Sequence, residues 1–429
     1  MPETLDQWLD HQQRQHVRSI ALGLDRVRTV WEALGAPRPA PLVITVGGTN
    51  GKGSVVAYLQ AMLRARKFKV GAYTSPHLVR YNERVTIDAQ EASDRALCDA
   101  FARIERARRM VPLTYFEYGT LAALLLFAES HVDVALLEVG LGGRLDAVNI
   151  IDADAAIVTT IGIDHVEYLG PDRDSIGREK AGIARPGRPL VLGSRDMPTG
   201  LLRAAQAAGA EIIRLGVDFD LFARSGGLFW DFCVPGRALA TEPPTSGLVA
   251  LERLPIAGQQ QYTNAAAALA ALWALRGRLG WESRAYALGL QQARLKGRLQ
   301  SLGGHPEVIV DVAHNPQAAV ELAAWLDAQA PCVTHAVFSA LADKDIAGIV
   351  SALGTRIDHW HVCGIADAGV RGSNVAHVTA ALQGALPHAT ISRHSDPCSA
   401  LAEARAVASG NARIVAFGSF HVVGAILRG

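Results

Sequence analysis

The first half of the chain alternates between short apolar runs and longer segments with the apolar spacing of a helix. The runs span residues 42–46, 70–73, 134–139, 156–161 and 189–192, and a helical pattern precedes or follows each of them. Strands that alternate with helices along a chain are typical of a parallel sheet covered by helices. We therefore predict an α/β domain with a parallel sheet in this part of the chain.

A second series of short apolar runs, at 308–312, 334–338, 360–363 and 413–417, predicts a second α/β unit. Before it, residues 218–255 are rich in glycine, proline and aromatic residues, which favours irregular β structure, and an alanine-rich helix is expected at 262–275. Residues 293–302, with Lys296, Gly297 and Arg298, are the expected linker. The predicted domains are residues 1–295 and 296–429.

Composition and charge limit the possible partners and compartment. The chain has 429 residues, and its 42 Lys and Arg nearly balance its 41 Asp and Glu, so no global field attracts nucleic acid or an anionic membrane. The five cysteines form no Cys-x-x-Cys pair, as expected of free thiols in a reducing compartment. The N-terminus is polar, and the longest apolar stretch, 265–275, is too short to span a bilayer. We predict a soluble, cytoplasmic protein.

A glycine-rich turn follows the first apolar run and precedes a helical segment at 55–66. Residues 47–54 read Gly-Gly-Thr-Asn-Gly-Lys-Gly-Ser. Glycines let backbone N–H groups converge on an anion, the helix N-terminus adds partial positive charge, Lys52 can neutralise phosphates, and Ser54 offers a hydroxyl to magnesium. The pattern G-x-x-x-x-G-K-[ST] is not met, because Val46 replaces its first glycine and Gly53 follows the lysine.

The alternative to a phosphate loop is an ordinary turn between a strand and a helix. We favour nucleotide binding, with the candidate residues Thr49, Asn50, Gly51, Lys52, Gly53 and Ser54. The loop alone does not tell what the nucleotide is used for.

Three polar residues stand at or just beyond the ends of predicted strands. Glu138 ends an apolar strand, where a carboxylate is costly to bury unless it is paired or bound to a cation. Ser75 and His165 follow two other strands, and the carboxyl ends of parallel strands share one edge of the sheet. Oxygen donors with one imidazole suit magnesium. Alternatively, Glu138 is a capping acid and His165 a loop histidine.

Other polar residues have ordinary structural interpretations when taken alone. Lys180, in the expected helix 174–184, would be a solvated lysine. Asp311 and His314 follow a strand, where an Asx-type turn capped by Asn315 and Pro316 is common. Asn264 would be the N-cap of the alanine-rich helix.

The phosphate loop resembles that of the Mur ligase superfamily, and especially its folate branch. Four further motifs of this branch follow in order: Thr-Ser-Pro-His-Leu at 74–78 with Tyr-Asn-Glu-Arg-Val at 81–85, Leu-Glu-Val-Gly-Leu-Gly-Gly-Arg-Leu-Asp at 137–146, Asp-His at 164–165 with Arg-Glu-Lys-Ala-Gly at 178–182, and Asp-Val-Ala-His-Asn-Pro at 311–316. The resemblance implies an α/β fold: a P-loop Mur-ligase-like N-terminal domain with a parallel sheet and a smaller Rossmann-like C-terminal domain.

The resemblance also implies that ATP and Mg²⁺ are used. The implied magnesium ligands are Ser54, Ser75, Glu138, His165 and Lys180, with Lys180 carbamylated by carbon dioxide. Carbamylation requires a deprotonated amine, which desolvation near other cations favours. Further implied nucleotide contacts are Asn264, Arg298 and Asp311, and His314 would lie near the reacting groups. The expected catalytic residues are Lys52, Lys180 and His314.

Three segments resemble the dihydropteroate-contacting segments of the bifunctional bacterial enzymes in this branch. They span residues 19–27, 114–119 and 145–147. The implied substrate-binding residues within them are Ser19, Ile20, Ala21 and Leu22; Thr114, Tyr115, Phe116 and Glu117; and Leu145, Asp146 and Ala147. An aromatic pair beside a carboxylate suits a flat, hydrogen-bonding pterin, although Tyr115 and Phe116 alone would be core residues that begin a helix.

The implied reactions are ligation of L-glutamate to dihydropteroate, giving dihydrofolate, and γ-glutamylation of reduced folates. Both use ATP and an acyl phosphate, and enzymes restricted to the second reaction share most of the motifs. A cell-wall peptide ligase is a second hypothesis, against which residues 75–78 and 82–85 argue, and a nucleotide-switched binding protein is a third. We expect small-molecule substrates, no nucleic-acid or membrane partner, and a monomer.

Overall fold

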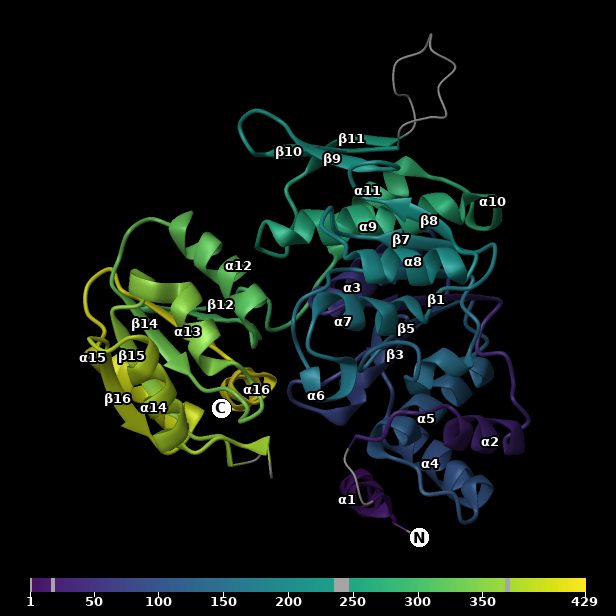
Figure 1. The fold of residues 1–429 in the computed structure, drawn as a ribbon, viewed down its shortest axis with the longest axis horizontal. Helices are drawn as coiled ribbons and strands as arrows, with labels where there is room; N and C mark the ends of the chain where they lie inside the picture. Colours follow the sequence, from purple (N-terminus) through teal and green to yellow (C-terminus); the bar gives the residue numbers. More distant parts are fainter. Residues whose placement is uncertain (1, 17–19, 235–246, 367–370) are drawn as a thin grey trace. The chain divides into compact units, whose positions relative to one another are not determined.

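The structure is a computed structural model that describes residues 2–16, 20–234, 247–366 and 371–429. The chain divides into two compact units (Figure 1). Unit 1 comprises Met1–Pro76, Asn82–Pro255 and Gln261–Arg294, and unit 2 comprises His77–Tyr81, Ile256–Gln260 and Leu295–Gly429. Segments far apart in sequence thus belong to the same unit.

Unit 1 is built on an eight-stranded sheet with the order β4-β3-β2-β5-β1-β6-β7-β8. The strands are β1 Leu42–Gly47, β2 Val70–Tyr73, β3 Val85–Ile87, β4 Gln90–Glu91, β5 Val134–Glu138, β6 Ala155–Val158, β7 Pro189–Leu192 and β8 Glu211–Arg214. All pairings from β2 across to β8 are parallel, which confirms the predicted parallel sheet, and only the two pairings of β3, with β2 and with β4, are antiparallel. The prediction of a strand over 156–161 was too long, because β6 ends at Val158.

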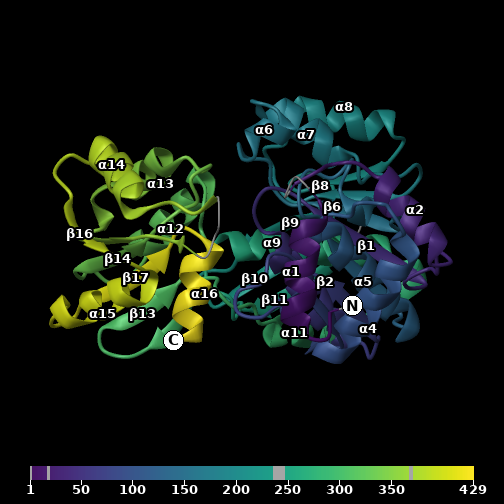
Figure 2. The same cartoon turned by 90° about the horizontal axis from the view of Figure 1, so that it is seen from below.

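Helices α1 Leu5–Gln15, α2 Asp25–Ala33, α3 Lys52–Ala65, α4 Asp94–Arg108, α5 Tyr115–Glu129, α6 Val166–Leu169, α7 Arg173–Ala181, α8 Thr199–Ala207, α9 Gln260–Ala274, α10 Arg276–Leu279 and α11 Ser283–Gln292 accompany the sheet. Two 3₁₀ turns, η1 Tyr81–Arg84 and η2 Ala147–Ile150, are also present. Helices α6, α7 and α8 lie together at one end of unit 1 (Figure 2). Helix α5 is apolar on all sides and is therefore buried from Glu117 to Phe127.

A small antiparallel sheet, with the order β11-β10-β9, completes unit 1. Its strands are β9 Asp220–Ala223, β10 Phe229–Cys233 and β11 Gly247–Glu252, in agreement with the β structure predicted for 218–255. Residues 235–246 of that segment lie outside the described residues.

Unit 2 is a six-stranded sheet with the order β12-β13-β17-β14-β15-β16. Its strands are β12 Gln300–Gly303, β13 Glu307–Val310, β14 Thr334–Phe338, β15 His359–Cys363, β16 Thr390–His394 and β17 Arg413–Phe417. Only β12 runs antiparallel to its neighbour. Helices α12 Pro316–Asp327, α13 Ile346–Leu353 and α14 Val375–Ala385 cover one face, and α15 Pro397–Val407 and α16 Phe420–Arg428 cover the other (Figure 2). A short turn, η3, spans Gly354–Arg356.

Within the described ranges, no helix combines the length and apolar character needed to cross a membrane.

A row of histidines crosses one face of the unit 2 sheet. Nδ1 of His335 lies 3.1 Å from Nε2 of His361, and the Ser392 hydroxyl lies 2.9 Å from both His361 Nδ1 and His394 Nε2. The ring of His359 stacks on that of His335 at 4.7 Å. Burial, followed by neighbouring imidazoles, lowers the pKa of His361 to about 4. Burial also lowers the pKa of His335 and His394, against the opposing charges of Asp358 for His335 and of Glu403 and Asp396 for His394.

We expect these histidines to make the fold acid-sensitive. The unfolded chain, with histidine pKa values of about 6.5, binds more protons than the folded chain between that pH and about 4. Their contribution to the free energy of unfolding is therefore complete above pH ~6.5 and is lost as the pH falls toward ~4. Urea unfolding at a series of pH values measures this loss. His361→Gln should reduce the slope of the free energy of unfolding against pH in this range. An unchanged slope would contradict the explanation.

Candidate active site

The phosphate loop connects β1 to α3 in a conformation that requires glycine. Gly48 has φ +137° and Gly51, the N-cap of α3, has φ +91°. Both lie in the region that side chains disfavour. Because the N-cap is a glycine, no side chain caps the first turn of α3. A helix N-terminus with this geometry is suited to binding an anion.

Two lysines meet at one carbonyl of this loop. Lys52 Nζ donates to the Gly48 carbonyl oxygen at 3.1 Å, and Lys180 Nζ donates to the same oxygen at 2.9 Å. Lys52 also donates to the Thr49 carbonyl at 3.3 Å. The loop therefore concentrates positive charge where phosphates are expected.

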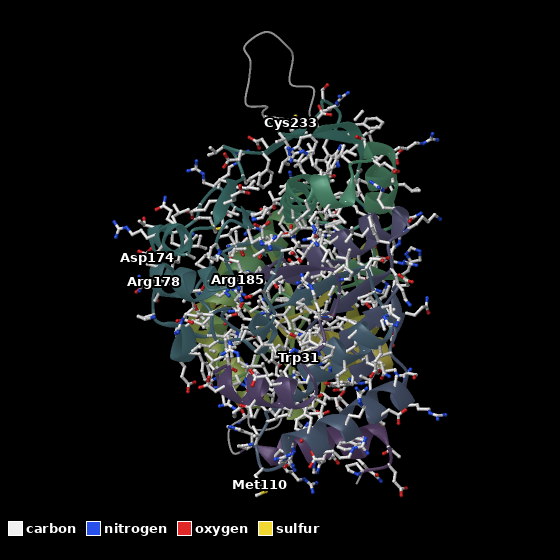
Figure 3. All side chains as sticks on the ribbon, turned by 90° about the vertical axis from the view of Figure 1, so that its right-hand side faces the viewer. Trp31, Met110, Asp174, Arg178, Arg185 and Cys233 are labelled. Atoms are coloured by element: carbon white, nitrogen blue, oxygen red, sulfur yellow. The ribbon has the colours of Figure 1, made fainter. Side chains whose placement is uncertain are left out.

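Lys180 is on the buried face of α7. In this helix Asp174 and Arg178 are exposed, as Figure 3 shows at the edge of the molecule, whereas Lys180 is only 4% exposed. Burial, and then the charge of Lys52, lower the pKa of the Lys180 amine to about 7, against the opposing effects of Asp164 and Asp146. The interpretation of Lys180 as a solvated lysine is wrong. Its position instead favours a neutral amine near neutral pH.

Glu138 and Ser54 have the properties expected of groups that hold a divalent cation. Glu138 is buried at the end of β5, and its Oε2 accepts a hydrogen bond from the Ser75 N–H at 3.1 Å. A Cβ atom at Gly53 would lie 3.8 and 3.9 Å from its two carboxylate oxygens, so the carboxylate lies beside the first turn of α3. Ser54 Oγ in that turn is buried without a hydrogen-bond partner among the described residues. A cation with oxygen ligands fits both groups.

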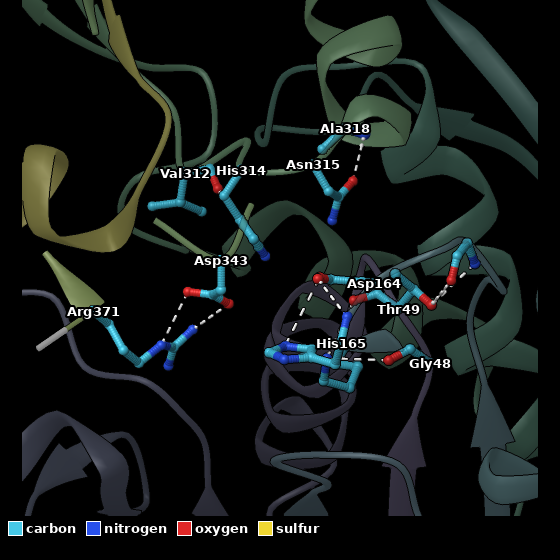
Figure 4. A network of polar contacts seen from close by, with 12 residues as sticks. Gly48, Thr49, Asp164, His165, Val312, His314, Asn315, Ala318, Asp343 and Arg371 are labelled. Atoms are coloured by element: carbon cyan, nitrogen blue, oxygen red, sulfur yellow. Dashed lines mark hydrogen bonds and ion pairs between the residues drawn. The ribbon is translucent and has the colours of Figure 1, made fainter. Parts of the chain in front are cut away.

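His165 is the N-cap of α6, at the end of the connection from β6. Its φ of +53° is uncommon for a residue other than glycine. Its N–H donates to Asp164 Oδ1 at 2.9 Å, and its Nε2 lies 3.9 Å from Asp164 Oδ2 (Figure 4). Sequence reasoning did not identify Asp164 as the partner of this ring. In the part of the chain that the structure describes, no three His, Cys, Asp or Glu side chains are arranged to hold a metal. Metal ligation by the five predicted residues, two of which are serines and one a lysine, stays a prediction.

Asn264 contacts the loop from within α9. A Cβ atom at Gly51 would lie 2.5 Å from Asn264 Oδ1, so the amide occupies the space beside this glycine. The N-cap interpretation of Asn264 is wrong, because α9 begins at Gln260 and Asn264 is inside the helix. A buried amide beside the loop is compatible with the predicted nucleotide contact.

An open pocket of about 430 Å³ lies beside the predicted substrate segment. Ile20, Ala21, Leu22 and Arg26 of that segment line it together with His16 and Tyr168, which sequence reasoning missed. The predicted residue Ser19 lies outside the described residues. Arg26 donates to the Ala21 carbonyl at 2.7 Å and to Glu117 Oε1 at 3.0 Å. One side chain thus joins two of the predicted substrate segments.

The second predicted segment opens α5. Thr114 is the N-cap, and Glu117 completes a capping box with it by accepting the Thr114 N–H at 2.7 Å. Tyr115 and Phe116 do begin a helix, as the core interpretation holds, and both are partly buried. The Arg84 guanidinium lies 5.4 Å from the Tyr115 ring centroid, and a Cβ atom at Gly140 would lie 2.6 Å from the Phe116 ring. Phe116 therefore packs against residue 140.

Asp146, in the third segment, is buried and held by backbone groups. It accepts hydrogen bonds from the Leu141 N–H at 2.8 Å and the Val148 N–H at 3.0 Å. Burial raises its pKa to about 6, although these bonds and Lys52 oppose the shift. The neighbouring Leu145 carbonyl accepts the Gly23 N–H at 3.1 Å, and Ala147 begins η2. The three predicted substrate segments are thus connected within unit 1.

In unit 2, Asp311 forms the Asx-type turn of the structural interpretation. Its Oδ1 accepts the Ala313 N–H at 2.7 Å, and its Oδ2 accepts the Leu299 N–H at 2.8 Å. Burial raises its pKa, against the charge of Arg298. His314 Nδ1 bonds to the Val312 carbonyl at 2.8 Å (Figure 4). The His314 ring and the Arg298 guanidinium both lie by Phe420, at 5.9 and 5.7 Å. Unit 2 therefore gathers the three predicted residues around one turn.

Comparison with known proteins gives matches along most of the chain. The Mur ligase middle domain matches residues 46–272, and the Mur ligase glutamate ligase domain matches residues 297–420. The dihydrofolate synthase/folylpolyglutamate synthase of Escherichia coli K12 is 42% identical over 424 residues, which cover 99% of this chain and 94% of that protein.

Solved structures agree with these matches. Escherichia coli FolC in complex with DHPP and ADP has a TM-score of 0.90 and 41% identity, and the match covers 100% of this chain and 98% of that one. A bifunctional folylpolyglutamate synthase/dihydrofolate synthase with Mn, AMPPNP and L-glutamate bound has a TM-score of 0.88 and 40% identity, over 99% of this chain and 98% of that one.

Proposed function

Because this chain belongs to the Mur ligase family, we infer that it is a dihydrofolate synthase/folylpolyglutamate synthase that uses ATP to ligate L-glutamate. It joins L-glutamate to dihydropteroate, which gives dihydrofolate, and it adds γ-linked glutamate to reduced folates. The observation that carries this conclusion is identity of 42% over 99% of the chain to an enzyme of this name. The phosphate loop, with Lys52 and Lys180 on one carbonyl, agrees with it.

The reaction needs an activated carboxylate. A carboxylate oxygen of the substrate attacks the γ-phosphorus of ATP, ADP leaves, and the glutamate amine then attacks the acyl phosphate and releases phosphate. In this chain, the first turn of α3 binds the phosphates and Lys52 stabilises the charge on the transferred group. Such catalysis depends on position and on charge more than on covalent chemistry.

The residues that would hold a divalent cation are Ser54, Ser75, Glu138, His165 and Lys180. Buried Glu138 and the buried Ser54 hydroxyl support this assignment. When bound, the cation neutralises phosphate oxygens. The remaining nucleotide contacts are assigned to Thr49, Asn50, Gly51, Gly53, Asn264, Arg298 and Asp311.

We propose that Lys180 is carbamylated by carbon dioxide. Its burial and lowered pKa supply the neutral amine that this addition requires. Carbamylation replaces the positive charge of the buried lysine with a negative charge. The carbamate and Glu138 could then both bind the divalent metal ion. Carbamylation also removes the repulsion between Lys180 and Lys52.

We propose that the pocket beside Ile20, Ala21 and Leu22 receives the pterin substrate, with the segments 114–117 and 145–147. Arg26→Ala should then raise the KM for dihydropteroate about tenfold and leave the KM for ATP unchanged, because it removes the contacts to Ala21 and Glu117. Steady-state kinetics with each substrate varied in turn measures both values. Arg28→Ala, on the exposed side of α2, is the control. Equal effects on both KM values would contradict the assignment.

The two activities are separated by one comparison of substrates. Purified protein is given ATP, magnesium and L-glutamate with either dihydropteroate or tetrahydrofolate, and products are identified by mass spectrometry. We expect a glutamate adduct with both. Product from tetrahydrofolate alone would remove the first activity, and product from neither would reject the function.

We also propose that the protein is a monomer. The molar mass measured by light scattering tests this.

A further inference from the structure

Thr159 and Thr160, which directly follow β6, form hydrogen bonds with the phosphate loop. The Thr160 carbonyl accepts the Thr49 N–H at 2.8 Å, and Thr160 Oγ1 accepts the Asn50 N–H at 3.1 Å. Thr159 Oγ1 donates to the Asn50 carbonyl at 2.5 Å and lies 3.3 Å from the Gly47 carbonyl. The N–H of Thr49 and both backbone groups of Asn50 are thus hydrogen-bonded to Thr159 or Thr160.

The side chain of Thr49 in the loop forms a further pair of hydrogen bonds. Thr49 Oγ1 accepts the Gly162 N–H at 3.0 Å and donates to the Gly162 carbonyl at 3.2 Å. Hydrogen bonds of this kind, between segments about a hundred residues apart, fix one conformation of a loop that glycines would otherwise leave adaptable.

Thr159 also fills the space behind Gly48. A Cβ atom at Gly48 would lie 1.9 Å from Thr159 Oγ1, so the hydroxyl is in direct contact with the glycine backbone. Thr159 is buried, and Gly48 has φ +137°. The position of the Gly48 peptide is therefore determined from behind by a side chain that cannot move into solvent.

The position of the Gly48 peptide also affects both lysines, because the Gly48 carbonyl accepts hydrogen bonds from Lys52 and Lys180. The bonds to Thr160 occupy the N–H groups of Thr49 and Asn50. These two peptides lead directly into the N-terminus of α3, which begins at Lys52 and whose N–H groups suit an anion.

We propose that Thr159 and Thr160 are positioning residues that hold the phosphate loop, and through Gly48 the two lysines, in the geometry that binds ATP. The proposal rests on the ATP-dependent function given above and adds two residues to it. Neither residue needs to touch the nucleotide, since both act through the loop.

The test compares Thr160→Val, which removes the hydroxyl, with Thr160→Ser, which retains it. Thr160→Val should raise the KM for ATP and the Kd for AMPPNP about tenfold, the effect of leaving the part-buried hydrogen bond to the Asn50 N–H unmade, and should change kcat by less than about threefold. Thr160→Ser should stay within about twofold of the parent protein in all three values. The control is Thr45→Val in β1, whose buried hydroxyl has no partner among the described residues.

Parent-like KM and Kd values for Thr160→Val would overturn the proposal, and so would equal losses in the Val and Ser variants, because shape alone would then explain them. Circular dichroism shows whether each variant is folded. Since AMPPNP binding is measured without turnover, a parent protein that binds it but ligates nothing would reject the ligase function separately, and the Kd values would still decide the role of Thr160.

Discussion

Replacing Lys180 with alanine is expected to lower turnover by about a hundredfold or more and to leave the fold intact. The expected loss is that of one charged group aimed at the transferring phosphoryl group. Lys180 is buried, and its amine bonds to the Gly48 carbonyl of the phosphate loop. Alanine removes this amine and any carbamate formed on it, whereas α7 keeps its capping box at Asp172. Steady-state ADP release measures the loss.

Two further measurements separate carbamylation from a lysine that acts as a cation. Small carboxylates such as formate should partly restore the activity of Lys180→Ala, because they replace an anion, and mass spectrometry under mild conditions should detect one added carbon dioxide on the parent protein. Arg178→Ala, on the exposed face of the same helix, is the matched control and should behave like the parent. Parent-like turnover of Lys180→Ala would remove Lys180 from the catalytic residues.

Glu138→Gln is expected to lower magnesium-dependent turnover by about a hundredfold, with a much smaller effect on nucleotide binding. The substitution keeps the shape of the side chain and its bond to the Ser75 N–H but removes the negative charge beside the first turn of α3. The magnesium concentration that gives half of the maximal rate should increase, whereas the affinity for AMPPNP without magnesium should change little. Both are read from titrations on the same protein sample.

A carboxylate elsewhere in the same sheet provides the control for Glu138. Glu211 begins β8 at the edge of the sheet and is exposed, so Glu211→Gln should leave both titrations unchanged. If Glu138→Gln turned over ATP at the parent rate, Glu138 would have no place in a metal site.

Local patterns were sufficient to predict the sheet and the phosphate loop. The apolar strands β1, β5 and β6 are read directly from the sequence, because buried parallel strands are continuously apolar. Gly48 and Gly51 have positive φ, so the need for glycine is likewise encoded locally. Strand β16 was missed, since Thr390–His394 is a polar edge strand without an apolar run.

Features that depend on tertiary packing could not be predicted from local patterns. A lysine in a short helix is usually solvated, and only the packing of α7 makes Lys180 a buried residue. Asn264 was placed at a helix start because the alanine-rich helix was expected to begin near it, at residue 262, whereas α9 begins at Gln260. The contacts of Arg26, Asp164 and Thr160 have no local signal, because the residues that they meet, such as Glu117, Lys180 and Asn50, are distant in sequence.

The resemblance to a family supplied what local patterns lacked. It selected Lys180 and Asn264 against their ordinary interpretations, and the structure locates both side chains at the phosphate loop. For Asp311, by contrast, the Asx-type turn accounts for the observed hydrogen bonds, so its role toward the nucleotide stays a prediction.

The most direct test of the central claim is ADP release by the purified protein in four mixtures. Each contains ATP and magnesium, with dihydropteroate and L-glutamate present together, singly or not at all. We expect sustained ADP release only when both substrates are present, with one dihydrofolate formed for each ADP. Binding of nucleotide without ADP release in the complete mixture, or equal release in all four, would contradict the claim that this chain is a glutamate ligase.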